Sequence, residues 1–287
     1  MSEDIPPSAP ETAPPDAVAP AAAGPGKLRR VFTDVVTSAP VVFSTGNLIW
    51  SLATAEKYGV ALNAGVLLAA TLAQIRDSLR GKQSGLSFFV TAGVHAASAV
   101  STLVNGADHI GVREMFNVLG SNDARRYVFT ALGRTGWAFA HFIMGWREKY
   151  GEDPKHIGSQ PVHAGYADIF MTAADTEKAL NAPALTLISA GLAKAFHDAK
   201  HPAGEGGGVR GFLARHVTPN RLYASTFVLG AVQALSNPFY AAAQALWGYG
   251  YTLLDGKRNR ELVADVKNLL FSAGFWTRPD SPRPPDA

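Results

Sequence analysis

The sequence contains no cysteine, and only 17% of its residues are Asp, Glu, Lys or Arg. The lack of cysteine excludes disulfides, thiolate metal sites and cysteine nucleophiles. No HExxH motif and no recognisable Ser/His/Asp set is present. The Gly-rich stretch at 204–208 lacks the Lys-Ser/Thr pair that completes a phosphate loop. We therefore expect no enzymatic activity, no metal site and no cofactor. We also expect no cleavable signal peptide, because the first apolar run starts only near Ala39.

The two ends of the chain are rich in proline and poor in large apolar residues. Such segments bury too little apolar surface to offset the entropy of ordering. We expect residues 1–30 to form a disordered acidic tail, and residues 261–287 an amphipathic helix followed by a disordered tail. These ends also lower the mean hydropathy to +0.04, a value low for a membrane protein. Between them we expect two helical halves, at 31–150 and 151–260.

Apolar runs of helical length fill the two halves. They cover residues 39–55, 60–76, 86–104, 127–146, 164–174 and 182–197, and two more segments lie within 221–255. A membrane-spanning helix needs about 20 mostly apolar residues, and several of these runs approach that length. We predict an all-α polytopic membrane protein with six to eight transmembrane helices. The alternative is a large soluble helical protein with a long apolar core.

Lysine and arginine concentrate in alternate loops between the apolar runs. One set of loops holds Lys27, Arg29, Arg30, Arg76, Arg80, Lys82, Arg147, Lys149, Lys155, Lys200, Arg210, Arg215, Lys257, Arg258 and Arg260. The other set holds only Lys57, Arg113, Arg125, Arg126 and Lys178. Cytoplasmic loops of membrane proteins carry such an excess of positive charge. We expect a multi-pass protein of the inner membrane with both termini cytoplasmic, in contact with the lipid bilayer and with no nucleic acid.

Weak self-similarity between the halves predicts an internal duplication. Without gaps, Phe89 aligns with Phe227 and His95 with Gln233, and a looser match pairs Phe43 with Phe170. An even number of helices per half gives a parallel repeat, an arrangement that some transporters use with the site between the halves. We therefore predict a small-solute transporter or permeation path.

Residues 72–88 read LAQIRDSLRGKQSGLSF, in which a helix end is followed by a basic linker and Gly-Leu-Ser. This resembles the PQ-loop signature of the SWEET and lysosomal-transporter-like families. Gln74 takes the Gln position and Gly85 begins the Gly-Leu-Ser, whereas Ala73 replaces the usual proline. The resemblance implies transport of a small solute, with Gln74 on its path.

Polar residues within apolar runs are candidates for the solute path, because they are costly in hydrocarbon. We expect Arg134 to bind an anionic substrate or to pair with Asp168 or Asp175, the alternative being a structural ion pair. Other candidates are Asn47, Trp50, Asn237 and Pro238, since a helix broken at Asn-Pro frees backbone carbonyls where it lines a cavity. The alternative for Asn-Pro is a plain turn.

His95 and His141 lie on neighbouring antiparallel runs and are candidate ligands of a b-type haem. Counted from the ends of the runs, they should lie at different depths, and the alternative is hydrogen-bonded packing. Two other functions thus stay open beside transport: haem-based electron transfer, and a membrane scaffold that assembles through small-residue faces such as Gly65, Ala69 and Ala73. A homo-oligomer is also left open.

Overall fold

The structure is a computed structural model that describes residues 26–55, 57–174, 181–200, 208–256, 261–262 and 264–266, all of it helical or irregular with no strand. The helices are α1 (Lys27–Val36), α2 (Ala39–Ala53), α3 (Lys57–Arg80), α4 (Leu86–Ile110), α5 (Val112–Met115), α6 (Asn122–Tyr150), α7 (Gln160–Ala174), α8 (Asn181–Lys200), α9 (Gly208–His216), α10 (Pro219–Gln233) and α11 (Pro238–Leu254). Most of the two expected disordered tails lies outside the described residues, whereas Lys27–Arg30 form the first turn of α1.

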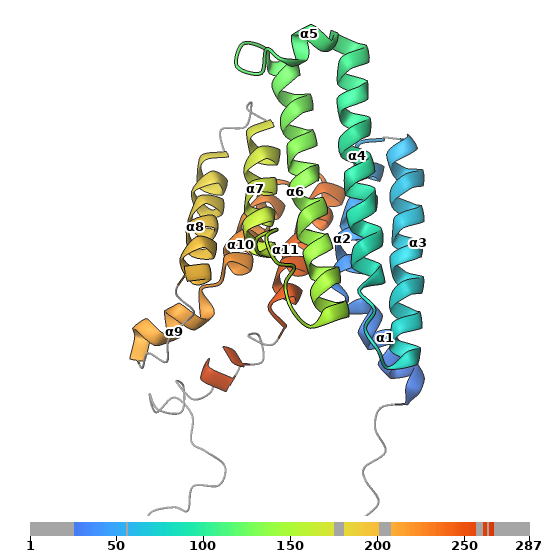
Figure 1. Ribbon diagram of the computed structural model, residues 1–287, viewed down its shortest axis with the longest axis vertical. Coiled ribbons are helices and arrows are strands. Elements are labelled where there is room, and N and C mark those ends of the chain that lie inside the picture. The colour runs from blue at the N-terminus through green and yellow to red at the C-terminus, as the bar shows by residue number, and fades with distance from the viewer. Residues whose placement is uncertain are drawn as a thin grey trace, which may run out of the picture.

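Eight of the described helices form a closed ring. In the order α2, α3, α4, α6, α7, α8, α10 and α11, each helix packs against the next, and α11 packs back against α2. Figure 1 views this ring from the side. The long helices α4 and α6 extend beyond the others to carry α5 at one end, and α1 lies at the opposite end (Figure 1). The space inside the ring is therefore bounded by helices from both ends of the sequence.

Local sequence signals set where these helices begin. Proline occupies one of the first two positions of α2, α10 and α11, where its missing N–H costs nothing. Three helices carry side-chain caps: Ser121 accepts from Ala124 N, Thr218 from Arg221 N, and Asn237 from Phe239 N. These caps fix the starts of α6, α10 and α11.

The turn between α3 and α4 requires glycine at position 85. Gly85 has φ +68°, and a Cβ at this position would overlap the carbonyl of Gly145 on α6. Glycine adopts this left-handed conformation without a steric penalty, and its missing side chain lets α4 start directly against α6. The register between α4 and α6 depends on this close approach.

Two of the described helices are long and apolar enough to cross a membrane by themselves, within Gly59–Arg80 and Leu86–Ile110. The pair α1 and α2, bent by 57°, also qualifies if it forms one span. This is fewer than the six to eight spans predicted from the sequence. The other apolar runs fail for two physical reasons: α2, α7, α10 and α11 have only 15 to 17 residues, and α6 and α8 carry charged groups.

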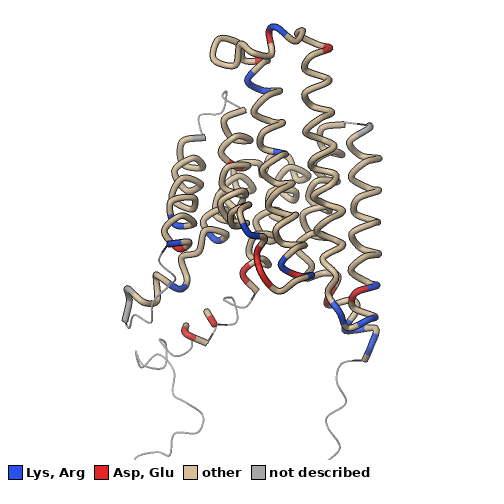
Figure 2. Tube along the Cα trace, viewed as in Figure 1, with Lys and Arg blue, Asp and Glu red and all other residues tan. Residues whose placement is uncertain are grey.

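The outer surface of the ring is nevertheless apolar. Large apolar side chains point outward from most of its helices, among them Leu68, Val100, Phe139, Val228 and Phe239. Figure 2 shows that charged residues gather at the two ends of the helices and that the middle is nearly free of them. Exposed apolar area of this extent marks a surface that contacts lipid or another protein. The candidate spans and this surface together indicate association with a membrane.

Candidate functional site

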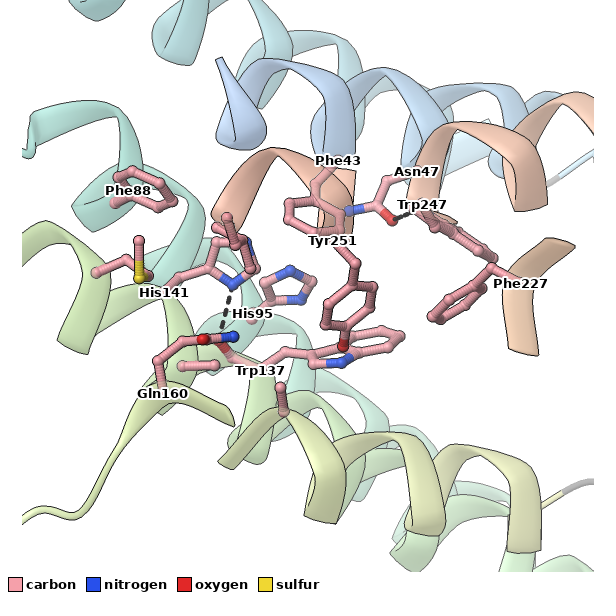
Figure 3. Close-up of a pocket in the computed structure, with 14 residues that line it drawn as sticks. Phe43, Asn47, Phe88, His95, Trp137, His141, Gln160, Phe227, Trp247 and Tyr251 are labelled. Atoms are coloured by element: carbon pink, nitrogen blue, oxygen red, sulfur yellow. Dashed lines mark hydrogen bonds between the residues drawn. The ribbon is translucent and has the colours of Figure 1, made fainter. Parts of the chain in front are cut away.

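A narrow central pocket of about 30 Å³ lies inside the ring. Six helices contribute to its wall, namely α2, α4, α6, α7, α10 and α11. Its main lining residues are Phe43, Asn47, Phe88, His95, Trp137, His141, Met144, Gln160, Phe227, Trp247, Tyr251 and Leu254, most of which are labelled in Figure 3. The wall is therefore mostly aromatic, with a few polar groups, which is the usual character of a small-molecule site.

Hydrogen bonds to polar groups on α2 and α7 fix the aromatic rings. Trp247 Nε1 donates to Asn47 Oδ1 over 3.0 Å. Trp137 Nε1 donates to Asp168 Oδ1 over 3.1 Å, and the Tyr251 hydroxyl donates to Asp168 Oδ2 over 2.9 Å. Asp168 is only 3% exposed, so its carboxylate is held behind two of the pocket's rings. This arrangement orients the ring faces without any charged side chain in the lining.

His95 and His141 lie side by side in the pocket wall, with ring centroids 5.2 Å apart (Figure 3). His141 Nδ1 lies 2.8 Å from Trp137 O. A carbonyl oxygen only accepts, so Nδ1 carries the proton and Nε2 presents a lone pair. Nε2 is buried and has no hydrogen-bond partner. The pocket therefore contains a hydrogen-bond acceptor that no protein group satisfies.

The expectation that the two histidines lie at different depths was wrong. The charged segment after Trp146 stays helical, and α6 runs on to Tyr150. His141 is therefore as far from the end of α6 as His95 is from the start of α4. Because the two rings are in contact with each other, a porphyrin plane has no room between them. In the described part of the chain, no group of three or more His, Asp or Glu residues is arranged to hold a metal ion.

A second, polar cavity of about 210 Å³ lies beside the central pocket, and we call it the vestibule. Its wall includes Asp34, Ser38, Gln74, Gln83 and Glu148. Ser38 Oγ donates to Gln74 Oε1 over 3.1 Å, whereas Glu148 Oε2 is buried without a partner. Burial raises the pKa of Glu148, and the nearby negative charge of Asp77 acts in the same direction. Together they raise this pKa from 4.5 to about 7.

Three side chains line both cavities: Phe88 of α4, Met144 of α6 and Leu254 at the end of α11. We call these three residues the gate. They are large, apolar and unbranched at Cβ, and Met in particular adapts its shape easily. The gate residues therefore lie between the vestibule and the central pocket.

The candidate residues predicted from the sequence do not form one site in the structure. Asn47 lines the central pocket and Gln74 the vestibule. Trp50 lies outside both linings, but its ring packs against Trp247 at 5.3 Å. Asn237 caps α11 and Pro238 is that helix's first residue, so the Asn-Pro break is a plain turn outside both cavities.

Arg134 also lies outside both linings. Its Nη1 donates to the backbone oxygen of Ser98 over 3.2 Å. The hydrogen bonds of Asp168 come from Trp137 and Tyr251. The other expected partner, Asp175, lies outside the described residues.

Sequence reasoning did not identify Trp137, Trp247, Tyr251 or Glu148 as site residues. The spacing of Trp137 to His141 equals that of Trp247 to Tyr251, and this was the available signal. Comparison with family models, with curated proteins and with solved structures finds no match for this chain.

Proposed function

We propose that this chain is a multi-pass inner-membrane protein that moves a small solute through the centre of its helix ring. The observation that carries the proposal is the sequence of vestibule, gate and central pocket inside a closed ring. A transporter needs an enclosed site that reaches water through a movable constriction. The gate residues Phe88, Met144 and Leu254 provide such a constriction.

Six to eight membrane crossings fit this proposal. The start of α2 and the end of α11 lie at the same end of the ring, which agrees with an even number of crossings (Figure 1). At 1.5 Å per residue, helices of 15 to 17 residues reach only about 22 to 26 Å, less than a hydrocarbon core of about 30 Å. The ring flanks them with the longer α3, α4 and α6. Local thinning of the bilayer accommodates the remainder.

A repeat of two four-helix halves is the second part of the proposal, in a register different from the one predicted from sequence. The motif Ser-x-Pro-Val stands at the start of α2, with Ser38 and Pro40, and again at the start of α7, with Ser159 and Pro161. Asn47 and Asp168 follow the motif at the same distance. Each accepts a hydrogen bond from a tryptophan of the other half.

The pocket lining follows the same register. Trp137, His141 and Met144 of α6 have the same spacing as Trp247, Tyr251 and Leu254 of α11, and all six line the pocket. His95 then corresponds to Phe227, which also lines the pocket, and not to Gln233 at the end of α10. These correspondences favour a site on the axis that relates the halves, as in transporters with parallel repeats. The PQ-loop resemblance of residues 72–88 stays a prediction.

Cysteine substitution tests whether the path is open to water. The chain lacks cysteine, so each variant carries a single thiol. We expect Met144→Cys, at the gate, to react with a small charged methanethiosulfonate reagent at least about tenfold faster than Met171→Cys. The difference follows because ionisation of a thiol requires water. Met171 is a matched control, since it packs against Gly133 outside both cavities.

Both variants are measured in the folded protein, with unfolded protein as the reference for intrinsic reactivity. Equal rates for Met144→Cys and Met171→Cys would show that the gate does not open to water. The proposed path would then be wrong.

A further inference from the structure

The charges that line the two cavities have one sign. Asp34 and Glu148 are the charged residues in the vestibule wall, and the central pocket has none, as far as the described residues show. The arginines beside these carboxylates lie outside both linings: Arg30 Nε lies 3.8 Å from Asp34 Oδ2, and Arg147 pairs with Asp153 at 2.6 Å. A solute entering from the vestibule therefore meets the carboxyl groups of Asp34 and Glu148 first, and no lysine or arginine among the described residues lines this cavity.

The unsatisfied atoms along this path are acceptors. Four buried side-chain atoms of the described chain have no hydrogen-bond partner, and two of them belong to residues that line the cavities. They are Glu148 Oε2 in the vestibule and His141 Nε2 in the central pocket. Neither atom is matched by a protein donor, so each favours a ligand that brings an N–H or O–H group.

The faces of the aromatic rings add to this preference. Phe43, Trp137, Phe227, Trp247 and Tyr251 line the central pocket, and the face of an aromatic ring attracts cations. Asp168 lies behind this wall and accepts hydrogen bonds from Trp137 and Tyr251. Its position places a carboxyl group next to the rings, on the side away from the pocket.

These observations argue against the anionic substrate expected from Arg134. Arg134 lies outside both linings and donates to Ser98 O on α4. In the described residues, no lysine or arginine side chain lines either cavity. An anion would meet ring faces and lone pairs in the central pocket, which repel it.

We infer that the solute is a small organic cation that carries an N–H group, such as a primary alkylammonium ion. Glu148 attracts it in the vestibule, and the gate admits its apolar part. The ammonium group then lies against the rings of Trp137, Trp247 and Tyr251 and donates a hydrogen bond to His141 Nε2. This inference rests on the proposed function for the route of entry.

Three solutes of equal carbon number and different charge test the inference: butylammonium, butyrate and butan-1-ol. Each is titrated into the purified full-length protein in detergent by isothermal calorimetry at pH 8. We expect butylammonium to bind at least about tenfold more tightly than either of the others, as a desolvated cation–π site requires. Tighter binding of butyrate or butanol, or no binding of butylammonium, would overturn the inference.

Two pairs of variants locate the site. Trp137→Leu should weaken butylammonium binding at least about tenfold, since it removes a ring face. Trp146→Leu is its control on the same helix, because Trp146 packs against Phe142 and Tyr150 outside both cavities. Glu148→Gln removes no packing volume and should weaken binding about threefold or more, whereas exposed Glu152→Gln should leave it within about twofold. Equal effects within either pair would contradict the assignment.

Uptake into proteoliposomes separates this inference from the proposed function. Binding of butylammonium without uptake would contradict transport and leave the cation site in place. Uptake of butyrate in preference to butylammonium would contradict the cation site and leave transport in place.

Discussion

At the scale of single residues, the site contains two acceptor atoms that no protein group satisfies. Leaving a buried acceptor unpaired costs about 1–3 kcal/mol, so a fold retains such atoms mainly where a ligand or water binds. His141 Nε2 and Glu148 Oε2 both lie in cavity walls. The fold is therefore less stable than it would be if both acceptors were paired.

Glu148 provides a prediction for stability against pH. Burial, with help from Asp77, raises the pKa of Glu148 from 4.5 to about 7, so the folded protein holds this proton more tightly than the unfolded chain. The stabilisation from this proton is complete below about pH 4.5 and is lost as the pH rises through 7. We expect Glu148→Gln to match the wild type in melting temperature at pH 5 and to exceed it at pH 8.

The melting temperature is measured in detergent from pH 5 to pH 8. The other charged groups around Glu148 are Asp34 of the vestibule, Asp77 with its partner Arg76, and Arg147 with its partner Asp153. Glu152→Gln is the control that changes the same charge at an exposed position. A constant difference between Glu148→Gln and wild type across this range would contradict the assigned pKa.

Part of the site could be predicted from the sequence. Asn47, His95 and His141 stood out as polar residues inside apolar runs, and all three line the central pocket. Glu148 did not stand out, because it lies in a charged stretch that looks like a loop. Because α6 continues to Tyr150, Glu148 lies on a helix, and its side chain lines the vestibule.

At the scale of elements, glycine controls how closely helices approach. Gly85 begins α4 in a left-handed conformation, directly against Gly145 of α6. This contact aligns His95 with His141. The relative position of the two histidines thus depends on the turn at Gly85, which directly precedes α4.

Gly85→Ala should disrupt this alignment. The added Cβ would overlap Gly145 O, and relief requires α4 to move away from α6. Gly151→Ala is the matched control, because Gly151 also adopts the left-handed αL conformation, with φ +81° and ψ −4°, but a Cβ there would meet nothing within 4 Å. The control should cost only about 1–2 kcal/mol of strain.

We expect Gly85→Ala to lower the melting temperature well beyond the effect of Gly151→Ala and to reduce the yield of folded protein. The measurement is thermal unfolding of both variants in detergent, with size-exclusion chromatography to report the folded fraction. Similar melting temperatures for the two variants would mean that α4 and α6 tolerate a wider separation than their packing indicates.

Helix content was predictable because long apolar runs without strand-like alternation leave few alternatives. The ends of the helices were less predictable, because charged residues after an apolar run can either continue a helix or start a loop. The ring order was not predictable, because Ala- and Gly-rich helix faces fit many partners.

At the scale of the whole molecule, the ring places helices that are too short or too polar to span a membrane alone beside helices that are long and apolar enough. Six of its eight helices do not qualify as spans alone, yet each packs against the next and α11 closes the ring against α2. If α3 and α4 cross a membrane, the others must lie at the same depth, because each packs along its neighbours. The topology of the whole ring therefore follows from that of any two adjacent helices.

Single cysteines test this topology in a chain that has none of its own. Gln83 and Glu152 lie in the turns after α3 and α6 at one end of the ring, and Gly120 lies beyond α5 at the other (Figure 1). Because lysine and arginine are in excess near the first end, we expect that end to be the cytoplasmic one. In intact cells, a membrane-impermeant maleimide should label Gly120→Cys, and it should label Gln83→Cys and Glu152→Cys only after permeabilisation. The reverse pattern would invert the orientation and keep the ring in the membrane. Equal labelling of all three, with protein released without detergent, would place the ring outside the membrane and remove the basis for transport.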